Sequence, residues 1–241
     1  MSFALYLTQS QIMTALRSVL LAILPSGVAV IQAQDNLVPE PAGSDFVVMT
    51  PLMRTRLETN VDAYADAAFT GSVAGTTLTV SAVRLGAITV GATMYAPVVG
   101  AVGTILQQLG GTTGGAGTYK LSQSATLSSG PMAAGTMSMM QPTELTVQLD
   151  VHGVTGSADN AQIISTLFRS HQAATLFAAQ GYDVTPMWAS DPRQTPFINA
   201  EQQVERMLSV DVHLQANQIV GTQQQFADVV TVNPHAPADN I

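Results

Sequence analysis

The chain has 241 residues, a formal net charge of −8 and no cysteine. A chain of this length buries roughly 70% of its unfolded surface, so it forms one or two hydrophobic cores without disulfides. The lack of cysteine also excludes thiolate metal sites, and the acidic balance argues against a nucleic-acid-binding surface, which needs clustered lysine and arginine. An acidic chain is still compatible with a protein past which DNA slides, because like charges repel.

Residues Thr8–Leu24 are predicted to form the first helix. Its apolar residues share one face, Thr8 or Ser10 can cap it, and a Pro-Ser-Gly sequence follows it. The apolar run Val19–Leu24 is far shorter than the roughly 20 residues of a membrane-spanning helix. It also lacks the basic start of a signal peptide. We therefore expect an amphipathic helix and no membrane segment.

Three short strands are expected next, over Val28–Gln34, Phe46–Met49 and Met53–Val61. The prolines and glycine of Leu37–Ser44 predict a loop between the first two. In the third strand, Arg54 and Arg56 fall on the polar face. Such a face either contacts the carboxylates of a partner or is simply solvated.

The composition changes between Ala68 and Met137. This stretch has no acidic residue and carries only Arg84 and Lys120, which give +2, whereas the remaining six basic and sixteen acidic residues give −10. Short β runs alternate there with glycine turns, which is typical of a small sandwich or barrel, with low-complexity disorder as the alternative. We expect residues 68–137 to form an inserted β module in a discontinuous domain of residues 1–67 and 138–241.

The stretch after this insert is expected to organise the rest of the fold. Apolar and polar residues alternate over Thr143–Gly153, which predicts a strand with one buried face. A helical period follows over Ser157–Gln180 and ends at Gly181. We therefore predict an α+β fold class. A mixed or antiparallel sheet is packed by two helices and carries the inserted small all-β sandwich or barrel.

The C-terminal third is expected to be mostly extended. Three prolines predict an ordered but irregular loop over Tyr182–Phe197. Residues Gln203–Asn217 are the longest strand candidate there, and Thr222–Asn233 should finish the fold with a further apolar run. Residues Pro234–Ile241 should be a loose tail.

Two stretches repeat the sequence Asp-Val-His. Residues two apart on a strand share a face, so Asp150, His152, Asp211 and His213 would offer a possible metal set if their strands pair. The favoured interpretation is that they belong to two ordinary polar strand faces. The run Gly110–Gly115 lacks the lysine and helix of a phosphate-binding loop, and there is no Gly-x-Ser-x-Gly elbow. We assign no catalytic, cofactor-binding or metal-binding residue, and expect neither an enzyme nor a cofactor.

Two parts of the sequence resemble proteins of tailed bacteriophages. The frame around the insert is similar to neck or tail-terminator proteins, and the similarity is carried by Asp35–Pro41, Phe46–Asn60, Thr143–Gly153 and Glu201–Gln215. The insert, with its sequence Gly-Gly-Ala-Gly-Thr-Tyr at 114–119, resembles a glycine- and threonine-rich β module grafted onto many phage virion proteins.

The resemblance implies a structural virion protein, made in the host cytoplasm and located in the tail neck. Its α+β subunits would form a homo-oligomeric ring, a hexamer, that stops tail-tube polymerisation and joins the tube to the head connector or to sheath proteins. DNA would pass through the lumen without specific binding. We expect an acidic lumen, an outward-projecting insert, and anchors at exposed strand edges and at Met187 and Trp188.

Three other functions remain open from the sequence. The chain would be another ring or adaptor of the same tail, at the sheath end or the baseplate end. Alternatively, the insert would bind the host surface as a decoration module, although it offers only Phe69, Tyr95 and Tyr119 as aromatic platforms. An enzyme would have only the two Asp-x-His pairs to use.

Overall fold

A computed structural model describes residues 4–33, 45–97, 99–153, 155–198 and 204–224. The chain divides into two compact units. We call residues 5–61 and 139–220 the large unit, and residues 62–138 with the chain ends 1–4 and 221–241 the small unit. The expected loop Leu37–Ser44, most of the expected strand Thr222–Asn233 and the expected tail Pro234–Ile241 lie outside the described residues.

The sheet of the large unit is mixed. Its strands follow the order β1-β10-β7-β3-β2, with bounds Ala4–Tyr6, Val204–Gln223, Gly117–His152, Phe46–Arg56 and Ala29–Gln32. Strand β2 runs parallel to β3, whereas β3 runs antiparallel to the end of β7. Two further strands, β8 (Val184–Ala189) and β9 (Arg193–Ile198), pair antiparallel with β10.

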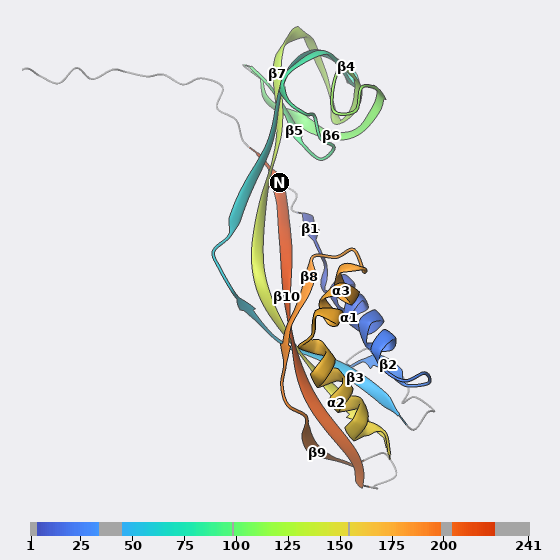
Figure 1. Cartoon of the computed structure of the whole chain (residues 1–241). Coiled ribbons are helices and arrows are strands. Elements are labelled where there is room, and N and C mark those ends of the chain that lie inside the picture. Colours follow the sequence, from blue (N-terminus) through green and yellow to red (C-terminus); the bar gives the residue numbers. More distant parts are fainter. Residues whose placement is uncertain (1–3, 34–44, 98, 154, 199–203, 225–241) are drawn as a thin grey trace, which may run out of the picture. The chain divides into compact units, whose positions relative to one another are not determined.

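Three helices pack on one face of this sheet (Figure 1). They are α1 (Gln9–Ile23), α2 (Ser157–Phe168) and α3 (His171–Ala178). Helix α1 begins as predicted, because Thr8 and Gln11 form a capping box. The single helix predicted over Ser157–Gln180 is two helices, because Ser170 accepts a hydrogen bond from the Ala173 amide and starts α3 instead of continuing α2.

The small unit is built from strands. It contains most of β4 (Val61–Gly86), β5 (Thr93–Ala96), β6 (Gly100–Gly111) and the first part of β7. Strand β5 pairs antiparallel with β6 and with β7, and β6 also pairs with β7. Their inward side chains form a core of their own, which includes Phe69, Leu78, Met94, Ile105 and Tyr119.

Each unit therefore has its own hydrophobic core. Most buried hydrophobic side chains of the described residues fall into one cluster of α1, α2, α3 and the large unit's strands, and a second cluster between Ala67 and Ala134. That the stretch 68–137 folds independently remains a prediction.

The predicted α+β class, with a sheet packed by two helices, is wrong. The structure is 62% strand and 18% helical, with three helices and a mixed ten-stranded sheet. Strand β4 continues through Gly75, which we expected to be a glycine turn between two short β runs. Strand β7 runs through Pro142, which takes part as an acceptor only, from the Leu57 amide at 3.1 Å.

The expected irregular loop Tyr182–Phe197 is likewise two strands. Its Pro186 and Pro196 lie in β8 and β9, each of which pairs with β10. A strand at the edge of a sheet tolerates proline, because on its unpaired side no hydrogen bond to a neighbouring strand requires the N–H group that proline lacks.

None of the described helices is long and apolar enough to span a membrane.

Candidate interaction surfaces

The face of the large unit's sheet that points away from the helices carries polar side chains that bond to one another. Leu145, Val147 and Leu149 point into the helix-covered core, so the residues between them point to the opposite face. There, Asp150 Oδ1 accepts hydrogen bonds from the Ser209 hydroxyl at 2.6 Å and from Gln148 Nε2 at 2.7 Å. The Asp150 carboxylate is therefore held by neutral donors of its own sheet.

The contacts across β7 and β10 show how the two strands run. Ser209 bonds to Asp150, whereas His213 bonds to Glu144, so residue numbers rise in opposite directions along the two strands. On the far side of β10, Arg193 in β9 pairs with Asp211 at 2.9 Å, and the Asp211 side chain is 17% exposed. The polar face is therefore held together by contacts that cross three strands.

His213 is enclosed by side chains of two other strands. Its Nδ1 lies 2.6 Å from Glu144 Oε1 and 3.3 Å from the Thr146 hydroxyl. Trp188 of β8 stacks on the imidazole, with ring centroids 3.6 Å apart and ring planes 11° apart. Sequence reasoning did not find this Glu144–His213–Trp188 group, because its members are tens of residues apart and only the strand pairing brings them together.

A β-bulge exposes the residues next to this group. Strand β10 pairs His213 with Trp188 but Leu214 with Pro186, so Met187 is an extra residue in β8. Met187 and Trp188 are 40% and 45% exposed, although both are large and apolar. These two residues are an exposed apolar patch, and exposed Met and Trp side chains are of the kind that anchors an interface.

The four residues of the repeated Asp-Val-His sequence do not converge. Asp150 bonds to Ser209, Asp211 pairs with Arg193, and His213 bonds to Glu144. The fourth, His152, is buried and stacks on Phe46 with ring centroids 4.3 Å apart. Among the residues that the structure describes, no group of three or more histidine or acidic side chains is placed to hold a metal ion.

The second half of β3 forms an exposed edge. Beyond Met49, the described part of the chain pairs with β3 only on the β7 side. A register shift between Pro51 and Met53 makes Leu52 a bulge, and the side chains from Leu52 to Arg56 are all exposed. Such an edge is a template for another strand.

The two arginines of this edge have different contacts. Arg54 donates to the side-chain oxygens of Gln9 and Gln218, so it bonds to its own chain. Arg56 donates to Asn60 Oδ1 at 2.8 Å, only four residues away. Both guanidinium groups remain on an exposed segment, so the edge is cationic as well as apolar.

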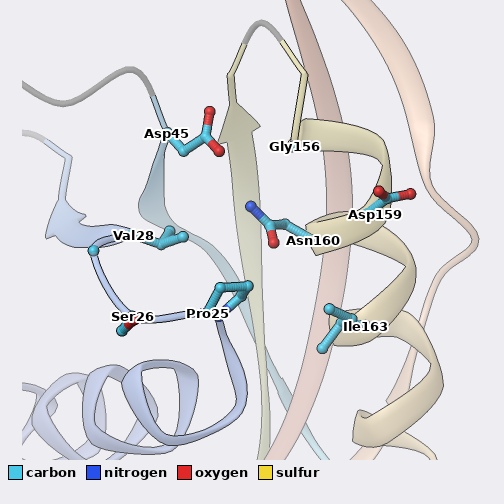
Figure 2. A pocket seen from close by; sticks show the side chains of 9 residues that line it. Pro25, Ser26, Val28, Asp45, Gly156, Asp159, Asn160 and Ile163 are labelled. Atoms are coloured by element: carbon cyan, nitrogen blue, oxygen red, sulfur yellow. The ribbon is translucent and has the colours of Figure 1, made fainter.

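One pocket of about 440 Å³ lies between the turn after α1 and the start of α2. Figure 2 shows Asp45 facing the first turn of α2, where Asn160 extends toward the sheet. A Cβ atom added to Gly153 or Gly156 would come within 2.3 Å or 2.4 Å of the Asp45 carboxylate. The two glycines thus make room for an acidic side chain at a helix N-terminus, where the helix dipole favours it. We interpret this packing of Asp45 against the start of α2 as structural, and we do not assign a ligand to the pocket.

These surfaces belong to a β-rich chain that offers two places for association. Its described residues offer an exposed strand edge and an apolar patch, with polar side chains that mainly satisfy one another.

Residues 104–237 match the family model of the phage neck terminator proteins. The match covers more than half of the chain, so the chain belongs to this family, and the resemblance seen in the sequence is confirmed. The protein is therefore a structural component of the bacteriophage tail neck that interacts with other head or tail proteins. The match begins at Thr104, inside the small unit, so it includes part of the expected insert and leaves out residues 1–103. Comparison with curated proteins returned no relative.

Proposed function

We propose that this neck terminator protein forms a closed ring, a hexamer, that caps the tail tube and joins it to the head connector or to sheath proteins. The family match over residues 104–237 is the observation that carries the proposal. A ring needs two different complementary surfaces on each subunit. The edge of β3 and the patch of Met187 and Trp188 are two separate surfaces of suitable kind.

We further propose that the lumen of the ring is net acidic, so that DNA passes without adhering. The chain outside residues 68–137 carries six basic and sixteen acidic residues. Like-charge repulsion keeps a phosphate backbone away from such a surface. A reconstruction of the neck that shows a basic channel would contradict this part of the proposal.

The small unit has a separate part in the proposal. We propose that residues 68–137 fold as an independent module that projects outward from the ring. Its separate core and its charge of +2 against an acidic remainder support this. The outward position leaves the ring contacts to residues outside 68–137.

The test of the terminator function is an infection in which the gene for this chain is interrupted. We expect overlong tail tubes and heads without attached tails, because no cap stops polymerisation. Supplying the intact chain in trans should restore tails of uniform length. Tails of normal length that are joined to heads without this chain would refute the proposal. A ring located at the sheath or baseplate end of the particle would refute only its position.

A further inference from the structure

Among the described residues, none pairs with the segment Thr50–Arg56 of β3 on the side away from β7. Strand β2 pairs with β3 only as far as Met49, and the last contact on that side is the bond from the Ala33 amide to the Met49 carbonyl. Past this point, the described chain supplies no strand on that side. The described residues therefore leave backbone groups of this segment to an added strand, except at Pro51, which has no N–H donor.

The side chains along this edge determine which kind of strand would be complementary to it. Leu52 and Met53 are 52% and 59% exposed, and Leu57 and Val61 continue the apolar surface. The residues from Thr50 to Leu57 include Arg54 and Arg56 and no acid. The matching strand would be apolar, rich in β-branched residues and acidic.

The C-terminal sequence of the chain has these properties. Residues 226–232 read Phe-Ala-Asp-Val-Val-Thr-Val, and Pro234 limits any strand to the residues before it. Residues 225–241 contain Asp228 and Asp239 and no lysine or arginine. The segment leaves the described structure in the small unit, where the Tyr95 hydroxyl donates to the Gln224 carbonyl.

We propose that residues 226–232 of one copy add as a strand to the edge Thr50–Arg56 of β3 in a second copy. Backbone hydrogen bonds hold the strand, the apolar side chains cover Leu52 and Met53, and Asp228, the one acid of the strand, faces the cationic edge. The contact joins two different surfaces, so it repeats head to tail, and it closes a ring when the rotation between neighbouring subunits closes. The inference rests on the proposed function, because it needs a self-associating chain.

Engineered disulfides test this pairing directly, because the natural chain has no cysteine. Thr55→Cys is combined, in the full chain, with one cysteine at 228, 229, 230 or 231. We expect disulfide-linked multimers on non-reducing gels at alternate positions, since only every second side chain points to the same face of a strand. Thr55→Cys alone, and Thr55→Cys with Asn240→Cys, serve as controls without the ladder.

Two results would overturn the strand exchange. Cross-links confined within single chains would show that the segment pairs with its own β3. An absence of cross-links at all four positions would show that the edge is not occupied by this segment.

Two truncations separate this inference from the terminator function. Ending the chain after Gln224 should abolish the oligomer while the fluorescence of the only tryptophan, Trp188, keeps its folded spectrum. Ending it after Asn233 should keep the oligomer. A ring that forms without residues 225–241 overturns the strand exchange and leaves the terminator function in place. Normal tails in an infection without the chain overturn the function, whatever the cross-links show.

Discussion

At the residue scale, the Asp45 carboxylate has room only because Gly153 and Gly156 carry no side chain. Gly156 has an ordinary backbone conformation, with φ −94° and ψ −11°, so its importance lies in space rather than in backbone freedom. Its hydrogen faces the Asp45 carboxylate, where a Cβ atom would lie 2.4 Å away. The start of β3 and the turn before α2 are thus held together by a close contact that only glycine permits.

We predict that Gly156→Ala lowers the free energy of unfolding by roughly 1–3 kcal/mol, because overpacking forces the backbone or Asp45 to move. Gly130→Ala is the matched control, since the nearest atom to a Cβ there is 3.9 Å away and the change should be close to neutral. Urea unfolding measures both. If the clash with Asp45 is the cause, Asp45→Ala should partly relieve Gly156→Ala in a double-mutant cycle.

The exposed side chain of Trp188 is a second single residue whose role can be tested. It covers His213 and is still 45% exposed, so it can serve both its own sheet and a partner. We predict that Trp188→Ala weakens ring assembly by about 30-fold or more, as for an interface hot spot of about 2 kcal/mol. Light scattering over a concentration series measures this. Val90→Ala, an exposed apolar residue of the small unit, is the control and should leave assembly unchanged. Unaltered assembly of Trp188→Ala would remove this residue from the interface.

At the scale of the elements, the sequence predicted local features better than pairings. The first helix begins at its predicted cap, and the strands at Thr143–Gly153 and Gln203–Asn217 exist, because caps and alternation depend on near neighbours. Strands β8 and β9 were missed because pairing with β10 imposes the extended form on a proline-rich segment whose own sequence predicts a loop.

The same limit applies to the candidate surfaces. The sequence singled out the repeated Asp-Val-His residues, but the register of β7 and β10 gives His213 the partner Glu144 instead of Asp150. Met187 and Trp188 were expected as anchors and are exposed, yet the bulge that presents them depends on the pairing with β10. Register is a tertiary property, and a shift by one residue would reverse every face.

The small unit offers a test by pH. The Tyr119 hydroxyl donates to the Gly115 carbonyl at 2.6 Å, and burial raises its pKa above 10; burial also raises the pKa of Tyr95. The folded state therefore keeps these protons where the unfolded chain loses them. The free energy of unfolding should be unaffected below about pH 10 and should fall above it, by at most about 1.4 kcal/mol per pH unit for each proton.

Thermal unfolding at pH 7 and at pH 11 measures this loss. Tyr119→Phe should reduce the difference between the two pH values, and adding Tyr95→Phe should reduce it further. Tyr64→Phe is the control, because Tyr64 is 58% exposed. An equal loss in all variants would place the sensitive groups elsewhere.

At the scale of the whole molecule, the main question is whether the ring depends on the small unit. The two units have separate cores, which favours independence, yet the family match starts at Thr104 and so includes part of the small unit. The two strands that lead into residues 68–137 lie close together at their start, since the Ser138 hydroxyl donates to the Ala63 carbonyl at 3.4 Å. A short turn can therefore replace the stretch, because a hairpin needs only two connecting residues.

We predict that replacing Ala68–Met137 by Asn-Gly leaves a folded chain that still assembles. The core of the large unit contains no residue of the deleted stretch, so the helical circular dichroism and the Trp188 fluorescence should be retained. Size-exclusion chromatography with light scattering then compares this chain with the full one, and Trp188→Ala in the shortened chain is the control that should lose assembly. A folded monomer would mean that the matched segment from Thr104 makes ring contacts, and an unfolded chain would mean that the two cores are not independent.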